Sequence, residues 1–246
     1  MPRFFVPTDN FELDTVRITG DDARHIARAL RMAKGEHITV CDMKGYEHDC
    51  VLEQFEDDVC VVARIMSSVK SENEPPYRIT LYQAAPKGDK LDYIVQKAVE
   101  LGAHEIIPFI SDRCVSRPDQ KSAQKKAERL TKIAKEAAKQ CGRATLPEVS
   151  DFCSFDRMLE DAEKCQLKLF LYEGDGTRSL PNVLRDRAEG FDSVCIVIGS
   201  EGGFSIEETK KAEERGFVLC GLGKRILRTE TASGCVLSCL MYEYEM

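Results

Sequence analysis

The segment IGSEGGFSIEE, from Ile198 to Glu208, places a carboxylate inside a glycine-rich turn. The apolar run that begins at Val194 and leads into it is typical of a strand buried on both faces. Ser205 followed by Glu208 is the S-x-x-E pattern of a capping box, so we expect a helix to begin after the turn. Open α/β sheets bind ligands at the carboxyl ends of their strands, and this order of elements therefore predicts a ligand-binding loop.

The residue types in this turn argue against a phosphate ligand. A P-loop requires GxxxxGK[ST] and a dinucleotide site requires GxGxxG, and the turn has neither pattern. Glu201 would repel an anion, and Ser205 and Glu208 already occupy the helix end that would receive one. S-adenosylmethionine fits better, because it has a cationic sulfonium and no phosphate. A tight structural turn with an exposed glutamate stays open as an alternative, since short glycine motifs are weak signals.

A second segment, LGKRILRTETA from Leu222 to Ala232, mixes residue types in the way that functional loops often do. It combines apolar side chains with three cations, Lys224, Arg225 and Arg228. The small residues that follow, in TASGCVLSC, would let a final helix pack very closely on another backbone. This segment strengthens the prediction of a ligand site.

Charge is distributed unevenly along the chain. The net charge of the 246 residues is −7, yet residues 112–147 carry ten basic and four acidic side chains. One basic block in an acidic protein is typical of a local contact with a polyanion. A solvated helix face with lysines at helical spacing explains the same charges equally well.

The chain changes character near residues 69–77, which contain two prolines and few apolar residues. Before this linker, short strands and one helix, DDARHIARALRM, predict a small β-barrel. After it, strands alternate with helices, as in RITLYQAA followed by LDYIVQKAVELG. This alternation predicts an α/β domain with a mainly parallel sheet.

Composition excludes several classes of protein. The start, MPRFFVPTDN, lacks the apolar stretch of a signal peptide, and no apolar run approaches the roughly 20 residues that span a bilayer. We therefore expect no membrane association and a location in the cytoplasm. The eleven cysteines are scattered and form no CxxC pair, and the four histidines do not join them at zinc-ligand spacing. We expect free thiols and no metal.

The two segments GSEGGFSIEE and LGKRILRTETA closely resemble the paired signatures of the bacterial 16S rRNA uridine-N3 methyltransferases. These enzymes belong to the trefoil-knotted SPOUT class, which uses S-adenosylmethionine. Other segments resemble the family in the family's order: RFFV, HIARALRMAKGE, PKGDKLDYIVQKAVELGAHEIIPF, SDRCVSR and AAKQCGRATLPEV. One residue departs from the pattern. The family's loop usually reads Gly-Pro-Glu-Gly-Gly, and Ser200 replaces the proline, which is expected to loosen the loop and weaken cofactor binding.

The resemblance implies a fold and partners. Residues 1–70 would form a PUA-like β-barrel that binds RNA, and residues 77–246 a SPOUT α/β domain with a deep trefoil knot. The implied partners are 16S rRNA in the small ribosomal subunit and a second copy of the chain, with the site at the interface of the homodimer. Ribose 2′-O methylation, and a catalytically silent rRNA-binding assembly factor, are the alternative functions.

The resemblance also implies a set of site residues. Arg228 would stabilise the charge that develops on uracil during methyl transfer. Glu201 would orient a ligand, assist proton transfer, or bind amides of its own loop. The expected cofactor-binding residues are Leu171, Tyr172, Glu173, Gly199, Ser200, Glu201, Gly202, Gly203, Leu222, Gly223, Ile226, Leu227, Thr231 and Ala232. The expected RNA-binding residues, each of which could equally be an ordinary surface cation, are Arg24, Arg28, Arg31, Lys87, Lys90, Arg113, Arg117 and Arg143.

Overall fold

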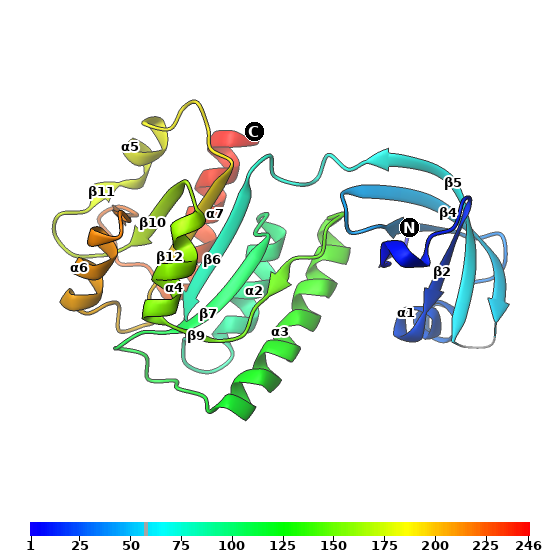
Figure 1. Cartoon of the computed structure of the whole chain (residues 1–246), viewed down its shortest axis with the longest axis horizontal. Helices are drawn as coiled ribbons and strands as arrows, with labels where there is room; N and C mark the ends of the chain where they lie inside the picture. The colour runs from blue at the N-terminus through cyan, green and yellow to red at the C-terminus, as the bar shows by residue number, and fades with distance from the viewer. Residues whose placement is uncertain (57–58) are drawn as a thin grey trace. The chain divides into compact units, whose positions relative to one another are not determined.

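The structure is a computed structural model that describes residues 1–56 and 59–246, and it divides the chain into two compact units (Figure 1). The first unit comprises Met1–Glu74 and Ala138–Leu146, and the second comprises Pro75–Ala137 and Pro147–Met246. The domain bounds expected from the sequence did not place residues 138–146 with the first unit. These residues pack there because the buried guanidinium of Arg143 binds Glu74.

The first unit is built on a five-stranded sheet with the order β1-β3-β4-β5-β2. Its strand pairs are antiparallel except for β1 and β3. Ile38 and Val40 alternate with more exposed neighbours and enter a core that Phe4 and Leu52 complete. The strands are β1 (Arg3–Phe5), β2 (Thr15–Thr19), β3 (His37–Cys41), β4 (Tyr46–Glu56) and β5 (Cys60–Lys70).

The single helix expected over DDARHIARALRM is shorter and less regular than the sequence suggests. It consists of α1 (Gly20–Arg24) and a π-helical turn at His25–Ala29. Ala23 and Ile26 are its buried residues. The helix cannot continue beyond this point because Arg31 adopts a left-handed conformation, with φ of 51°.

The second unit contains an eight-stranded sheet with the order β11-β13-β10-β12-β6-β7-β8, and β9 pairs with β7 beside this path. Every pair in it is parallel, which confirms the predicted α/β architecture. The strands are β6 (Arg78–Ala84), β7 (Glu105–Ile110), β8 (Glu148–Val149), β9 (Cys153–Ser154), β10 (Leu167–Leu171), β11 (Arg178–Ser179), β12 (Ser193–Ile198) and β13 (Val218–Gly221).

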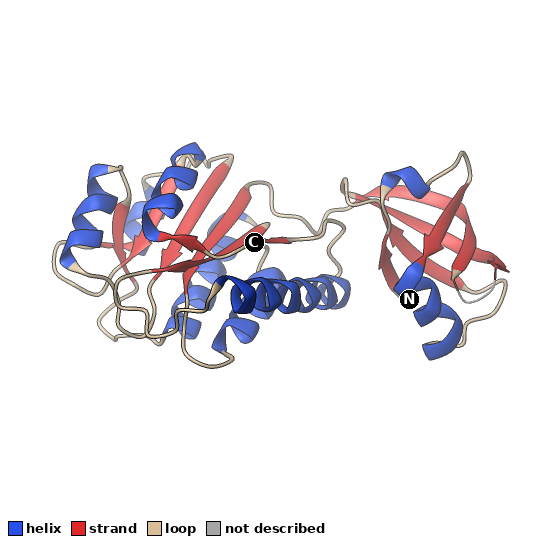
Figure 2. Cartoon of the chain, turned by 60° about the horizontal axis from the view of Figure 1, so that its bottom comes forward, coloured by secondary structure: helices blue, strands red, loops and turns tan. Residues whose placement is uncertain are grey.

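Helices cover both faces of this sheet, as Figure 2 shows. Phe155 of α4 and Ala212 of α6 share one core cluster with Phe109, Phe170 and Phe204. On the opposite face α7 packs against α2 and β12. The helices are α2 (Lys90–Glu100), α3 (Gln120–Cys141), α4 (Phe155–Asp161), α5 (Leu180–Arg185), α6 (Ile206–Glu214) and α7 (Thr229–Tyr244).

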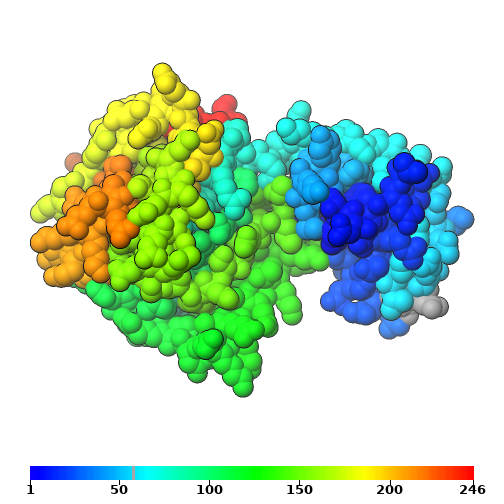
Figure 3. Space-filling model, viewed as in Figure 1, coloured from blue at the N-terminus to red at the C-terminus, as the bar shows by residue number. Residues whose placement is uncertain are grey.

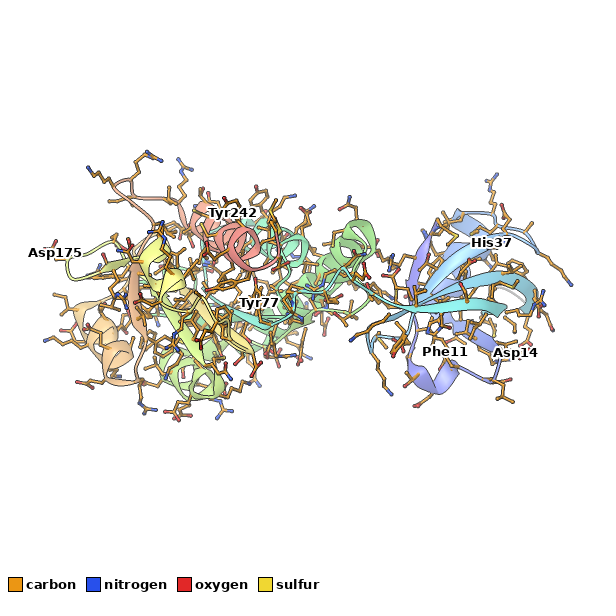
Figure 4. All side chains as sticks on the ribbon, turned by 90° about the horizontal axis from the view of Figure 1, so that it is seen from above. Phe11, Asp14, His37, Tyr77, Asp175 and Tyr242 are labelled. Carbon is orange, nitrogen blue, oxygen red and sulfur yellow. The ribbon has the colours of Figure 1, made fainter. Side chains whose placement is uncertain are left out.

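The far end of α7 is anchored by an aromatic cluster. Tyr77, labelled in Figure 4, donates a hydrogen bond of 2.7 Å to Glu245 Oε1. Its ring lies 5.1 Å from that of Phe191 and 5.7 Å from that of Tyr244. These contacts fix the end of the last helix, which begins at Thr229, two residues before the start expected near Thr231. The threading of the knot stays a prediction of the family resemblance.

Across residues 1–56 and 59–246, no helix has the length and apolar character needed to cross a membrane. The same residues contain no cluster of three or more histidine, cysteine or acidic side chains placed to hold a metal ion. All eleven cysteines are free thiols, and four of them are buried in the second unit: Cys114, Cys165, Cys195 and Cys220.

Candidate functional site

Three loops meet at the carboxyl edge of the parallel sheet. The strands β13, β10 and β12 are neighbours in that order, and all run in the same direction. The loops that follow Leu171, Ile198 and Gly221 must therefore lie side by side. Asp175, labelled in Figure 4, marks the loop after β10 at the outer edge of the unit. Two adjoining cavities of about 150 and 340 Å³ lie between these loops, a combined size within the roughly 300–1,000 Å³ of small-molecule sites.

The cavities bring together most of the residues expected to bind a cofactor. The first cavity includes Tyr172 and Gly223, and the second includes Gly199 and Glu201. The cavities share the following expected residues: Leu171, Glu173, Ile226, Leu227 and Ala232. Two expected residues lie elsewhere: Gly202 contacts Arg113, and Thr231 lines a separate groove between α2 and α7.

Sequence reasoning missed several lining residues. Thr177 and Cys220 line the first cavity, and Phe204 and Thr229 line the second. Thr177 belongs to a short connection without motif character, and Cys220 and Phe204 read as core residues in the sequence. Ile226, one of the expected cofactor-binding residues, lines both cavities but is 84% exposed.

The glycines of the central loop are required by close approaches of the protein to itself. Gly203 has φ of +65°, and a Cβ there would lie 2.5 Å from Glu173 Oε1. A Cβ on Gly202 would lie 3.0 Å from Arg113 Cβ, and one on Gly199 would lie 3.1 Å from the Phe204 ring. A side chain at Gly203 would be strained by its left-handed backbone, and one at Gly202 would press on Arg113, so these glycines let the loop keep its close contacts.

Ser200, which stands where the family usually has proline, is buried and held in place. The Gly203 amide donates to Ser200 O at 3.0 Å and closes a tight turn. The Ser200 hydroxyl donates to Arg113 O at 3.4 Å. These contacts oppose the loosening that we expect from the loss of the proline.

The carboxylate of Glu201 is bound by the segment that follows β6. It accepts hydrogen bonds from the Lys87 amide at 3.2 Å and from Lys90 Nζ at 2.8 Å. Burial alone would raise the pKa of Glu201, but the hydrogen bonds from Lys90 and from the amides of Glu201 and Lys87 outweigh it and lower the pKa. Glu201 is therefore an ionised carboxylate at neutral pH and a weak proton acceptor.

Arg228 lies at the rim of the second cavity, in the N-cap position of α7. Its side chain is exposed. Within the parts of the chain that the structure describes, its guanidinium has no hydrogen-bond or ion-pair partner. Of the two expected catalytic residues, Glu201 is bound by Lys90, whereas Arg228 can donate hydrogen bonds to a substrate.

The residues expected to bind RNA lie in different environments. Arg24, Arg28 and Arg31 are all exposed in the first unit, and Arg24 forms an ion pair with Asp21. Arg113 is exposed and donates to Gly202 O at 3.1 Å. Lys87 is exposed, and Lys90 is engaged by Glu201.

Two further members of that set have structural partners. Arg117 donates to the carbonyls of Ser111, Asp112 and Cys114, and so holds its own loop together. Arg143 is 3% exposed, and its guanidinium is bound by Glu74 at 2.7 Å. Donors of both arginines are thus engaged within the protein, and we do not propose either residue as an RNA contact.

The sequence matches two protein families. Residues 73–241 match the RNA methyltransferase domain family, and residues 18–58 match the RNA methyltransferase PUA domain family. The chain is 38% identical to ribosomal RNA small subunit methyltransferase E of Bacillus subtilis, an alignment that covers 100% of this chain and 98% of the relative. This chain belongs to the ribosomal RNA small subunit methyltransferase E family. The resemblance inferred from the sequence motifs is thereby confirmed.

Solved structures of similar proteins agree with this assignment. The structure of ribosomal RNA small subunit methyltransferase E from Neisseria gonorrhoeae, bound to S-adenosyl methionine, matches with a TM-score of 0.85 and 33% identity. That match covers 99% of this chain and 98% of the relative. A crystal structure of a hypothetical protein matches with a TM-score of 0.91 and 37% identity, covering 99% and 98% of the two chains. The fold of the family, a small β domain and a mainly parallel α/β domain, is the fold of this chain.

Proposed function

We propose that this protein transfers a methyl group from S-adenosylmethionine to N3 of a uridine in 16S rRNA of the small ribosomal subunit. The observation that carries this proposal is the pair of adjoining cavities at the carboxyl edge of the sheet, with Arg228, whose side chain is exposed, at the rim. Membership of the small subunit methyltransferase E family supports the class of reaction and substrate. A ribosomal substrate implies that the reaction occurs in the cytoplasm.

The donor set of the cavities fits S-adenosylmethionine, which supplies the methyl group as part of a sulfonium. Leu222 and Leu227 offer apolar surface to an adenine ring. Glu173 lines both cavities, and its carboxylate can attract a cation, whereas the carboxylate of Glu201 is already bound by Lys90. The capping box of α6 is complete, because Ser205 and Glu208 satisfy that helix end themselves. A phosphate would find no vacant helix terminus there.

The chain's own residues contribute position and charge stabilisation to the proposed reaction. The glycine loop and the segment from Leu222 to Ala232 hold the two reactants in line. Loss of the uracil N3 proton leaves negative charge on O2 and O4, and Arg228 stabilises that charge with its free donors. Glu201, with its lowered pKa, organises the loop rather than taking the proton. As N3 bonds to the methyl carbon, the bond from that carbon to the sulfonium sulfur would break and leave a neutral thioether, and the N3 proton would pass to water at the open rim.

A basic face of α3 is suited to contact RNA phosphates. Lys121, Lys125 and Lys132 are exposed, and their spacing of four and seven residues places them on one side of the helix. The start of α3 and the loop before it form a margin of the second unit, drawn in green in Figure 3. Arg28 and Arg31 of the first unit are further candidates, because both are exposed.

We also propose that the protein is a homodimer that uses the groove between α2 and α7. Tyr93 and Leu101 line this groove beside the small residues Gly234, Cys235 and Ser238 of α7. Small residues permit close packing of a second copy, and Tyr93, which is 52% exposed, supplies apolar surface to bury. Light scattering should give twice the chain mass of 27.7 kDa. A monomer at micromolar concentration would contradict the dimer.

The function is tested with small ribosomal subunits from cells that lack this gene. The subunits are incubated with the protein and S-adenosylmethionine, and their nucleosides are identified by mass spectrometry. New 3-methyluridine is the expected product. A 2′-O-methylated nucleoside would retain the cofactor but contradict the proposed chemistry. RNA binding without any methylated product would favour a silent assembly factor.

A further inference from the structure

The first turn of α7 is tied to two other segments by a buried chain of hydrogen bonds. Gln83, fully buried at the end of β6, donates from Nε2 to Thr229 Oγ1 at 2.8 Å. Thr229 Oγ1 donates in turn to Gly199 O at 2.6 Å. Thr229 is 5% exposed, so water does not compete for these bonds. This inner link joins β6, the glycine loop and α7.

An outer link, nearer to solvent, joins α2 to the same glycine loop and to α7. Lys90, the first residue of α2, places Nζ 2.8 Å from Glu201 Oε1 in the glycine loop. The same Nζ lies 3.6 Å from Glu230 Oε2 in the first turn of α7. Glu230 Oε2 is buried and accepts no hydrogen bond from any residue in the described parts of the chain. Lys90 is therefore the cation that balances this oxygen.

Arg228 stands directly before the two linked residues of α7. Its guanidinium has no partner among the described residues, so its position depends on the main chain that carries it. That main chain is the N-cap of α7, with φ of −65° and ψ of 152°. Thr229 and Glu230, the next two residues, are the ones that the inner and outer links hold.

We propose that Lys90 and Gln83 are positioning residues for the methyl transfer, acting through the first turn of α7 to fix Arg228 against the glycine loop. This proposal rests on the proposed function and adds two residues to it. The assignment of Lys90 differs from the RNA contact expected from the sequence. Two carboxylates already hold its ammonium, so an RNA phosphate would have to displace them.

The outer link is tested by comparing Lys90→Met with Lys90→Arg in the full-length protein. A positioning role predicts that Lys90→Met lowers kcat by about ten- to a hundredfold, because small misplacements near a reacting centre have effects of this order. The Kd for small-subunit rRNA and its salt dependence should stay unchanged. Lys90→Arg keeps the cation and should restore most of the rate.

An RNA contact predicts the opposite pattern for the same variants. Loss of one phosphate contact lowers the slope of log K against log salt by about one and weakens RNA binding, with kcat at saturating RNA unchanged. That result would overturn the proposal, as would a Lys90→Met variant with wild-type kcat. Lys210→Met is the matched control, because Lys210 is an exposed lysine of α6, a helix that takes part in neither link.

The inner link is tested by Thr229→Val and Thr229→Ser. Valine keeps the shape and removes the hydroxyl, so kcat should fall while the Kd for S-adenosylmethionine changes less than threefold. Serine keeps the hydroxyl and should restore the rate. Equal kcat for both variants would overturn the inner link. An inactive wild-type protein would instead contradict the proposed function, and circular dichroism of each variant separates both outcomes from misfolding.

Discussion

Each unit of this protein contains a carboxylate held by a cation, and the two arrangements differ in how completely the charges are satisfied. In the first unit Glu74 accepts hydrogen bonds from Arg143 Nε and Nη2, at 3.1 and 2.7 Å. It also accepts from the amides of Ala144 and Thr145, at 2.9 and 3.0 Å. In the second unit Lys90 serves two carboxylates, and one oxygen of Glu230 accepts no hydrogen bond from a described residue.

This difference indicates that the pair of Glu74 and Arg143 stabilises the fold, whereas Lys90 and its carboxylates position residues of the site. A buried, fully bonded ion pair is costly to break, because removing one partner leaves a buried charge. A partly exposed pair contributes little to stability, since solvent screens it. Lys90 and Glu201 line the second cavity, so this pair can position groups there without contributing much to stability. Substitution of the first pair should therefore lower the free energy of unfolding, whereas substitution of the second should lower the rate of methyl transfer and change stability little.

The largest expected effect is that of Glu74→Gln on stability. The change leaves the buried guanidinium of Arg143 without its counter-charge and should cost about 3–5 kcal/mol of unfolding free energy. Urea unfolding followed by circular dichroism measures it. Glu72→Gln is the matched control, because Glu72 is exposed and should change stability by less than about 0.5 kcal/mol. Similar losses for both variants would remove the contrast between the two regions.

Acid should weaken the same pair without mutation. Burial alone would raise the pKa of Glu74, but the hydrogen bonds and charge of Arg143 and the amide of Thr145 outweigh it and lower the pKa. A lowered pKa means that the stabilisation is present above the ordinary value of 4.5 and is lost as pH falls through the folded-state value. The stability difference between wild type and Glu74→Gln should therefore shrink below about pH 4.5. A difference that grows in acid would contradict this assignment.

Two glycines with left-handed backbones, Gly203 at the site and Gly216 away from it, allow a matched comparison of substitutions. Gly203→Ala forces alanine into φ of +65° and places Cβ against the Glu173 carboxylate. We expect a strain of about 1–2 kcal/mol and an S-adenosylmethionine Kd about tenfold higher by calorimetry. Gly216→Ala carries the same strain, at φ of +76°, but lies at the end of α6. Gly216→Ala should lower the free energy of unfolding and leave the Kd for S-adenosylmethionine unchanged. A raised Kd for Gly216→Ala would show that the effect is not local.

Much of the fold could be predicted from the sequence, because local patterns determine it. The apolar run to Ile198 and the capping box of Ser205 and Glu208 have direct local causes, and both are present. The short α1 could not be predicted, because the left-handed Arg31 is not visible in the hydrophobic pattern. The hydrophobic pattern also does not show whether a charged residue is exposed or buried. Arg143 and Arg117 look like surface cations in the sequence, and only tertiary partners show that they are structural.

The site was predictable where motifs carry it and not where distant residues meet. The glycine loop and the segment from Leu222 follow from spacing and residue type. The contacts of Lys90 with Glu201 and of Gln83 with Thr229 join residues more than 100 positions apart. No periodicity or spacing rule connects such pairs, so the structure was needed to find them.

The smallest expected effect is that of Ser205→Ala at the start of α6. Its hydroxyl accepts from the Glu208 amide at 3.2 Å and donates to Asp112 at 2.9 Å. Loss of this N-cap should cost about 1 kcal/mol, measured by thermal unfolding. Ser205→Asp keeps the capping acceptor but places a second carboxylate against Asp112, so it should recover only part of the loss. Full recovery would show that the bond to Asp112 contributes nothing.

The measurement that tests the central claim most directly is the single-turnover rate of methyl transfer by Arg228→Met. Wild type and variant are compared with saturating S-adenosylmethionine and small ribosomal subunits, alongside their melting temperatures. Removal of one charge-stabilising donor group should lower the rate by about 10²- to 10³-fold, with an unchanged melting temperature. A variant that methylates uridine N3 at the wild-type rate would contradict the role of the carboxyl edge in the chemistry.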